Sequence, residues 1–140
     1  MTNKPSEIES QAVERIRQAV SRYAAAWLAG DRPALAACYH EEFALHYFGS
    51  NPFAGHHRGK PASLAVLAEV TRRTNRKLLG IIDIMAGPKR GALLVRERFD
   101  RDGNAVELER LLVYAVRDDG RLGECWVYDQ DQALIDRFLS

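Results

Sequence analysis

Residues 92–128 read ALLVRERFDRDGNAVELERLLVYAVRDDGRLGECWVY. This stretch decides the fold because apolar and polar side chains alternate along it and two Asp-Gly pairs, at 102–103 and 119–120, interrupt the alternation. Alternation is typical of β-strands, and Asp-Gly is typical of the tight turn between antiparallel strands. With the Gly87-Pro88 turn signal upstream, the pattern predicts an antiparallel meander with strands at 78–85, 92–99, 106–116 and 122–128.

The Asp-Gly turns also predict which residues face each other across the strands. With two-residue turns, the expected pairs are Arg98 with Glu107, Arg96 with Glu109, Tyr114 with Cys125, and Val113 with Trp126. Opposed residues share a face of the sheet, and neighbours alternate between faces. One face therefore carries Leu93, Val95, Phe99, Leu108, Leu112, Tyr114, Cys125 and Val127, with Glu97, Arg110 and Asp129 as its polar members.

The opposite face of this sheet is largely apolar as well. It carries Leu94, Leu111, Val113, Trp126 and Tyr128. A sheet with one side in water shows polar residues on that side, and the helices can cover only one face. The sequence therefore predicts a homodimer through the Trp126 and Tyr128 face. The alternative is that a C-terminal helix at 131–139 folds back over this face.

The N-terminal third is helical in pattern. Ser6 and Glu9 form a capping box, and apolar residues then recur at helical spacing through Ile8, Ala12, Ile16, Val20, Tyr23 and Trp27. Gly30 ends this helix, and Asp31 caps a short second one with Leu35, Cys38 and Tyr39 on its inner side. We expect a strand at 43–48, a loop at 49–59 and a further helix at 61–74.

Length and composition limit the classes of function. A chain of 140 residues is of ordinary size for a single domain, so we expect one domain over 1–140. The formal net charge of +1 gives no general attraction to nucleic acid. No apolar run is long enough to span a membrane, and residues 1–5 lack the features of a secretory signal, so the expected location is cytoplasmic. Cys38 and Cys125 are expected to be small buried hydrophobic residues without a disulfide.

The segment from His46 to Lys60 concentrates aromatic and imidazole side chains in a stretch rich in Gly and Pro. Such a loop usually borders a pocket, here one for a small apolar molecule. His56 and His57 could bond a ligand carbonyl; alternatively, they contact water or backbone. No His-x-His or His-Glu-x-x-His spacing is present, so the sequence predicts neither a metal site nor a cofactor.

Several motifs together resemble the nuclear transport factor 2-like superfamily, and most closely its polyketide-cyclase (SnoaL-like) branch. They are YAAAWLAGD at 23–31, NPFAG at 51–55 followed by Arg58-Gly59, and the chain end from Trp126 to Gln132. The resemblance implies an α+β fold, with a cone-shaped, curved antiparallel sheet wrapped around N-terminal helices, as in cystatin-like proteins. It also implies a pocket at the open end of the cone.

The resemblance discriminates among activities residue by residue. Tyr23 matches the helix tyrosine of the steroid isomerases, but their base and oxyanion acid fall at Tyr47 and Leu112, so that chemistry is disfavoured. The Arg-x-Asp motif of the epoxide hydrolases is absent as well. Asp129 lies where the cyclases have the aspartate that serves as acid and base.

The expected surroundings of Asp129 also favour a role as acid and base. A carboxylate among apolar walls can exchange a proton near neutral pH, because desolvation raises the pKa of carboxylates. The alternative is that Asp129, or Asp131, only caps the final helix. His46 lies next to Tyr47 in a strand, so only one of the two can face the pocket; Tyr47 aligns with the pocket side, and His46 is kept as a candidate.

The sequence therefore predicts a site with Asp129 as acid and base and with Tyr23 and either His46 or His57 as polarising donors. Arg110 either forms a salt bridge with Glu97 or holds an acidic group of the ligand. The expected ligand contacts are Trp27, Tyr39, Tyr47, Phe48, Phe53, His56, His57, Arg110, Leu112, Tyr114 and Val127. The predicted function is binding of a small apolar or polyketide-like molecule, with cofactor-independent cyclase or isomerase chemistry. The alternative is a noncatalytic module that binds a ligand or another protein.

Overall fold

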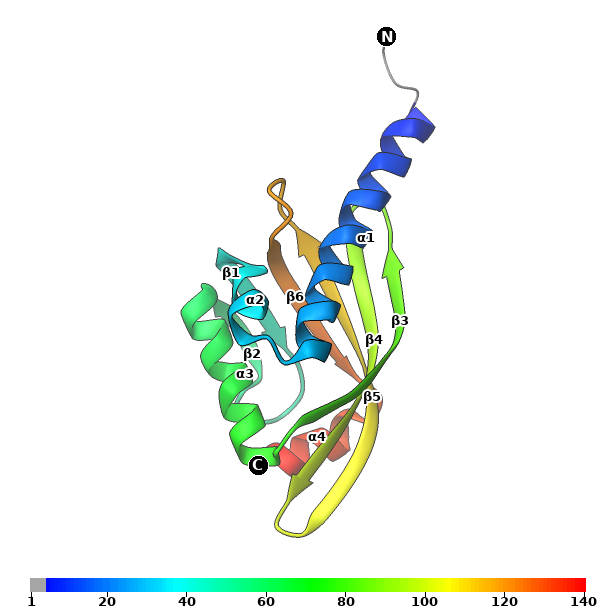
Figure 1. The fold of residues 1–140 in the computed structure, drawn as a ribbon. Helices are drawn as coiled ribbons and strands as arrows, with labels where there is room; N and C mark the ends of the chain where they lie inside the picture. Colours follow the sequence, from blue (N-terminus) through cyan, green and yellow to red (C-terminus); the bar gives the residue numbers. More distant parts are fainter. Residues whose placement is uncertain (1–4) are drawn as a thin grey trace.

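The computed structural model describes residues 5–140 and has an α+β architecture in which helices pack on one face of a curved sheet (Figure 1). In chain order the elements are α1 (Pro5–Ala29), α2 (Arg32–Ala37), β1 (Tyr39–Tyr47), β2 (Gly55–Arg58), α3 (Lys60–Thr74), β3 (Lys77–Ala86), β4 (Arg90–Arg101), β5 (Asn104–Val116), β6 (Leu122–Asp129) and α4 (Gln132–Leu139).

The six strands form a single sheet in the order β2-β1-β6-β5-β4-β3. The predicted meander is confirmed, and so is its register: Arg98 lies opposite Glu107, and Val113 lies opposite Trp126. Neighbouring strands are antiparallel except for β1 and β6, which pair in parallel. A long connection containing four strands and a helix separates these two in the chain, so their direction is not restricted to that of a hairpin.

Helix α1 crosses the sheet and buries its apolar stripe against it (Figure 1). Ile16 and Val20 are almost fully buried at the centre of this contact. The contact is close because Gly91 of β4 has no side chain; a Cβ atom there would lie 2.7 Å from Val20 Cγ1 and 2.9 Å from Ile16 Cγ2. We call the side of the sheet that packs against α1 the inner face.

The start of α1 differs from the prediction. The helix already includes Pro5, so Ser6 lies inside the helix, and the capping box predicted from Ser6 and Glu9 is wrong. Ile8, expected on the buried stripe, is 54% exposed because α1 projects beyond the sheet at this end (Figure 1). The other end is as predicted, with Gly30 in the left-handed region at a φ of 65°.

Two predictions between α1 and α3 are wrong. Tyr39, expected on a helix, is the first residue of β1, which therefore begins four residues earlier than predicted. The expected loop at 49–59 contains the short strand β2, which pairs with β1 so that His46 lies opposite His56. Asp31 caps α2 as predicted, its side chain accepting a hydrogen bond from the Ala34 amide.

Helix α4 closes one end of the core and does not cover the outer face of the sheet. Asp131 is its N-cap, and Ile135 and Leu139 are buried in the same cluster as the inner-face residues. Tyr128 on the outer face remains 46% exposed. The alternative in which this helix folds back over the Trp126 and Tyr128 face is therefore wrong.

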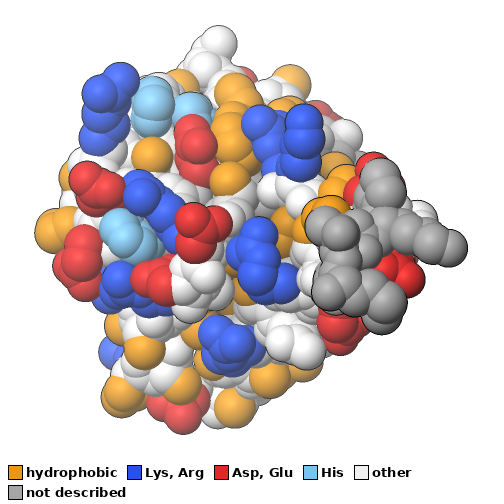
Figure 2. Space-filling view, turned by 90° about the horizontal axis from the view of Figure 1, so that it is seen from above, with side chains coloured by type: hydrophobic (Ala, Val, Ile, Leu, Met, Phe, Trp, Pro, Cys, Tyr) orange, Lys and Arg blue, Asp and Glu red, His pale blue; other side chains and the backbone are white. Residues whose placement is uncertain are grey.

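The end of the molecule from which α1 projects carries interspersed charges. Figure 2 shows acidic and basic side chains side by side there, without a large area of one sign. Among the residues that the structure describes, no helix combines the length and the apolar composition needed to span a membrane.

Candidate functional site

A cavity of about 570 Å³ opens between the inner face of the sheet and the helices α1, α2 and α3. Its volume is in the range of pockets that enclose small organic molecules. Apolar side chains form most of its wall: Trp27, Leu35, Phe43, Leu45, Leu64, Leu67, Leu112 and Val127. The polar groups on the wall are the hydroxyls of Tyr23, Tyr39, Tyr114 and Thr71, the thiol of Cys125, and four guanidinium groups, of Arg32, Arg72, Arg76 and Arg110.

Three tyrosines from three elements meet at the cavity. Tyr23 of α1 and Tyr39 of β1 share a hydrogen bond between their hydroxyls, and the ring of Tyr114 lies 5.4 Å from that of Tyr23. Burial raises the pKa of Tyr23 to about 12, although its bond to Tyr39 opposes the shift. Burial likewise raises the pKa of Tyr39 and of Tyr114 well above the ordinary value. All three phenols are therefore protonated at neutral pH and can donate hydrogen bonds.

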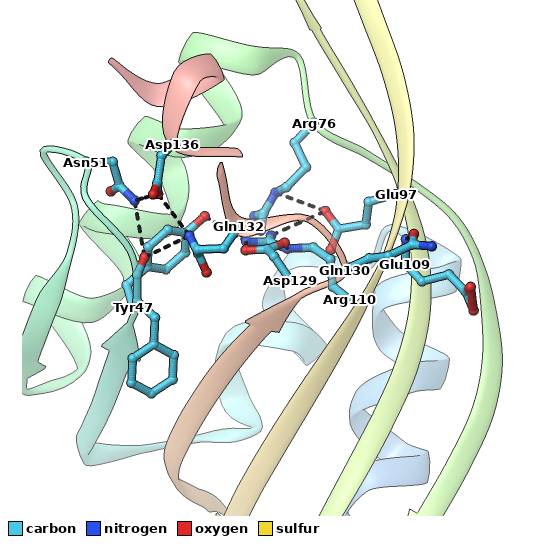
Figure 3. Close-up of polar contacts among 11 residues, drawn as sticks. Tyr47, Asn51, Arg76, Glu97, Glu109, Arg110, Asp129, Gln130, Gln132 and Asp136 are labelled. Carbon is cyan, nitrogen blue, oxygen red and sulfur yellow. Dashed lines mark hydrogen bonds and ion pairs between the residues drawn. The ribbon is translucent and has the colours of Figure 1, made fainter. Parts of the chain in front are cut away.

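Arg110 of β5 is the buried cation of the cavity (Figure 3). Its Nε donates to Asp129 Oδ1 at 2.5 Å, and its Nη2 donates to Asp129 Oδ2 at 3.1 Å and to the Tyr47 hydroxyl at 2.7 Å. Desolvation acts to lower the pKa of Arg110, but the charges of neighbouring groups, Tyr47 first and then Asp129 and Glu97, outweigh it and raise that pKa well above its usual range. The guanidinium is held in place by bonds from two of its three nitrogens.

Glu97 completes a buried group of four charges with Arg76, Arg110 and Asp129. Its Oε2 lies 3.5 Å from Arg76 Nε and 3.9 Å from Arg110 Nη1. Neither carboxylate oxygen of Glu97 has a hydrogen-bond partner among the described residues, although the side chain is fully buried. The two cations therefore compensate the two anions by charge, and both cations, but neither anion, lie on the cavity wall.

Asp129 does not occupy the position predicted for it. It caps no helix, because Asp131 does so, and it is absent from the cavity wall. Both of its oxygens accept hydrogen bonds from Arg110, which lies between it and the cavity. The predicted salt bridge of Arg110 with Glu97 is present, but the closer partner is Asp129, directly opposite Arg110 in the β5–β6 register.

The histidines predicted for the site lie away from the cavity. His46 points to the outer face, as strand alternation from Tyr47 requires, and bonds Glu124 there. His56 lies beside it, with ring centroids 4.1 Å apart. His57 bonds the carbonyl of Phe53 at 2.7 Å, as the backbone alternative expected. Their placement on the pocket wall is therefore wrong.

The other predicted ligand contacts divide into two groups. Those on the cavity wall are Tyr23, Trp27, Tyr39, Arg110, Leu112, Tyr114 and Val127. Tyr47 is buried behind the wall and contacts the cavity only through its bond to Arg110. Phe48 packs on Tyr128 of the outer face, and Phe53 packs under Arg73, so the prediction that these two rings line the pocket is wrong.

The loop that contains Phe53 is fixed to α4 rather than to the cavity (Figure 3). Asp136 accepts hydrogen bonds from the Ser50 amide at 2.9 Å, from Asn51 Nδ2 at 2.8 Å and from Gln132 Nε2 at 2.9 Å. Desolvation acts to raise the pKa of Asp136, but these hydrogen bonds outweigh it and hold that pKa below its ordinary value. The segment predicted to border the pocket thus has a structural role at the end of the core.

Helix α3 supplies wall residues that the prediction did not assign to the site. Leu64, Leu67 and Ala68 recur at helical spacing in the sequence, and this stripe faces the cavity. Arg76 follows the end of α3, lines the cavity and pairs with Glu97. The helical period was the available signal for the first three; for Arg76 nothing local indicated a partner twenty-one residues further along the chain.

The wall of this cavity provides apolar contact and hydrogen-bond donors. No aspartate, glutamate or histidine lines it among the described residues. Burial raises the pKa of the Cys125 thiol to about 12, so this group is protonated at neutral pH too. A ligand oxygen could accept hydrogen bonds here, whereas the nearest carboxylates are engaged with arginines.

Comparison with known families agrees with this architecture. The sequence model of the SnoaL-like domain matches residues 20–124, which is most of the chain. The chain belongs to the SnoaL-like family. No curated protein matches the sequence.

Solved structures of other proteins share the fold. Bal32a, from a soil-derived mobile gene cassette, is 22% identical with a TM-score of 0.81, over 92% of this chain and 99% of that one. A nuclear transport factor 2-like protein of Burkholderia xenovorans LB400 is 22% identical with a TM-score of 0.72, over 91% and 98%. TerC, co-crystallised with polyporic acid, is 13% identical with a TM-score of 0.74, over 89% and 98%. At these identities the likeness establishes the fold alone.

Proposed function

We propose that this SnoaL-like protein binds a small, largely apolar molecule in the cavity between α1, α3 and the inner face of the sheet. The observation that carries the proposal is the tyrosine cluster of Tyr23, Tyr39 and Tyr114 at the wall of a cavity that is otherwise mostly apolar. Pockets of this volume with few polar groups are typical of small-molecule sites. TerC, of similar fold, was co-crystallised with polyporic acid.

The polar groups define how the ligand would lie. Protonated phenols donate to a carbonyl or hydroxyl oxygen, so the ligand's oxygen is expected at the tyrosine cluster. Arg76 and Arg110 provide a second polar point for an acidic oxygen, and Trp27 provides a flat apolar surface for a ring. We therefore expect an aromatic or polyketide-like compound that carries at least one oxygen acceptor.

Proton-transfer chemistry of the cyclase or isomerase type is the second candidate. The favouring observation is that Arg110 lies on the cavity wall while both of its bonded nitrogens hold Asp129. A ligand anion that bonds Arg110 in place of Asp129 would free the carboxylate to accept a proton from carbon. Under this second candidate, Asp129→Asn retains ligand binding and loses turnover; under the first, the wild-type protein leaves every bound compound unchanged.

The two tryptophans allow a direct binding test. Trp27 lines the cavity, whereas Trp126 lies on the outer face, stacked on His46. A Trp126→Phe variant reports the cavity by fluorescence, and a Trp27→Phe variant reports only the outer face. Titration with phenolic, steroid-like and polyketide-like compounds should change the tryptophan emission saturably in Trp126→Phe and leave it unchanged in Trp27→Phe.

A matched pair of substitutions on α3 tests where these compounds bind. Ala68→Phe places a ring at the cavity wall and should weaken binding at least tenfold, about 1.4 kcal/mol. Ala65→Phe places the same ring on the same helix away from the wall and should have no effect. Equal affinities of the two variants, or no saturable binding by the wild-type protein, would contradict the proposal.

We also propose that the chain forms a homodimer through the outer face. The apolar side chains of β5 and β6 there are only partly buried, and Tyr128 is 46% exposed. Residues 5–140 provide no helix that covers this face. An isologous contact between two such faces would bury them. Cytoplasmic location remains a prediction from the sequence.

A further inference from the structure

Three side chains that commonly bind metals meet on the outer face of the sheet, away from the cavity. They are His46 of β1, His56 of β2 and Glu124 of β6, and one ligand atom from each lies within 4.8 Å of the others. The register explains the meeting: His46 lies opposite His56, and Glu124 precedes by two residues Trp126, the partner of His46. Three neighbouring strands thus present the three side chains on one face.

The backbone and a stacked ring hold most of this cluster in place. The His46 ring stacks parallel to Trp126 with centroids 4.9 Å apart, and Arg90 covers Trp126 at 4.1 Å. His46 Nε2 bonds Glu124 Oε2. His56 is exposed, so its side chain can rotate while the side chains of His46 and Glu124 stay in place. Two positioned ligands and one adjustable ligand are well suited to closing around an ion.

Charge and access both favour a cation at this cluster. Within residues 5–140 the side chain of Glu124 bonds His46 and pairs with no lysine or arginine, so its negative charge is available. A solvent-open hollow of about 550 Å³ adjoins the cluster; its charged lining consists of the carboxylates of Glu41, Glu42 and Glu124 and the guanidinium groups of Arg58 and Arg117. An ion can enter from that side with its hydration water.

We propose that His46, His56 and Glu124 form a site for a divalent transition-metal ion of the zinc class. Two imidazoles with one carboxylate are a known ligand set for zinc, whereas magnesium and calcium prefer oxygen ligands alone. Zinc–ligand distances of about 2.0–2.2 Å place tetrahedral ligand atoms roughly 3.3 Å apart. Rotation of the exposed His56 side chain toward the other two brings the cluster from its present spread to that spacing. The fourth position is left for water.

This site is independent of the proposed ligand binding, because its residues lie outside the cavity and all come from one chain. Spacing rules did not indicate it, since the three ligands come from three strands that pair only in the folded sheet.

The four histidines of the chain provide a matched control. The experiment titrates zinc chloride alone into chelator-treated protein without a histidine tag, by isothermal titration calorimetry. We expect one ion per chain and at least a tenfold loss of affinity in His56→Gln and in Glu124→Gln. The double variant His40→Gln/His57→Gln removes both imidazoles outside the cluster and should bind as the wild type does.

Each result of the zinc titration supports or overturns the proposed site. His56 is exposed, so its variant should fold, and far-ultraviolet circular dichroism checks this before titration. Absence of zinc binding by the wild type, unchanged binding in the folded His56→Gln variant, or an equal loss in the His40/His57 control would each overturn the proposal.

Discussion

At the residue scale, the buried tyrosine cluster makes the free energy of unfolding decrease at alkaline pH. The unfolded pKa of tyrosine is about 10, and burial raises that of Tyr23 to about 12 in the folded protein. The native state therefore keeps a proton that the unfolded state releases, so this contribution is complete below pH 10 and is lost as pH rises toward 12. For Tyr23 alone the loss is about 3 kcal/mol, since one pKa unit corresponds to about 1.4 kcal/mol.

Urea unfolding at several pH values between about 9 and 12 measures this loss. The Tyr23→Phe variant lacks one of the buried phenols, so its free energy of unfolding should fall less steeply with pH than that of the wild type. The free energy of each protein at pH 7, where phenols are protonated in both states, serves as the baseline. Identical slopes above pH 10 would contradict the buried, protonated cluster.

The buried ion pairs of Arg110 can be tested by substitution. Arg110→Met leaves the buried carboxylates of Asp129 and Glu97 with less compensation, and removing one partner of such a pair costs about 3–5 kcal/mol. Adding Asp129→Asn to Arg110→Met removes the stranded charge and should restore part of that stability. Urea unfolding of the two single variants and the double variant closes a mutant cycle. A purely additive cycle, or a cost below about 1 kcal/mol for Arg110→Met, would contradict the described pairing.

The Arg110–Asp129 pair is an example of a contact in the site that can be predicted from the sequence. The predicted register places Val113 opposite Trp126, and counting three residues outward along both strands places Arg110 opposite Asp129. The pairing could therefore be predicted from the Asp-Gly turn, although the turn in the structure is longer than two residues and a register shift between Ala115 and Val116 restores the predicted register. The position of Tyr39 at the start of a strand could not be predicted, because the same apolar spacing suits a short helix and the start of a strand.

At the element scale, the approach of α1 to β4 depends on Gly91. In Gly91→Ala the new Cβ meets Val20 and Ile16, which are almost fully buried and cannot turn away. Overpacking of this kind costs about 1–3 kcal/mol. Thermal unfolding should therefore show a lower midpoint for this variant.

Gly80→Ala on the neighbouring strand β3 is the matched control. A Cβ at Gly80 meets no atom within 4 Å, so this variant should unfold within about 0.5 kcal/mol of the wild type. If both glycine variants had the same stability, the close helix–sheet contact would not be the cause.

Elements were predicted well where local signals determine them and poorly where long-range pairing does. The Asp-Gly turns fixed the meander and its register, and the apolar stripe fixed α1 and α3. Strand β2 was missed because His56 and its neighbours have no apolar alternation; it forms only because the edge of β1 is available for pairing. The positions of His46 and His56 on the outer face follow from that pairing.

At the scale of the whole molecule, the uncovered outer face predicts self-association. Tyr128→Glu places a charge on this face and should convert a wild-type dimer into a monomer in sedimentation equilibrium. Leu28→Glu is the control, because Leu28 is a similarly exposed apolar residue on α1. A monomeric wild type, or dissociation by Leu28→Glu alone, would contradict the proposed interface.

The central claim is that the cavity on the inner face binds a small apolar molecule through its tyrosine cluster. A crystal structure with the tightest compound from the fluorescence panel tests it most directly. The account predicts a ligand oxygen within hydrogen-bond distance of Tyr23, Tyr39 or Tyr114 and apolar ligand atoms against Trp27 and Leu112. A compound bound only outside this cavity, with the cavity filled by the protein's own side chains, would contradict it.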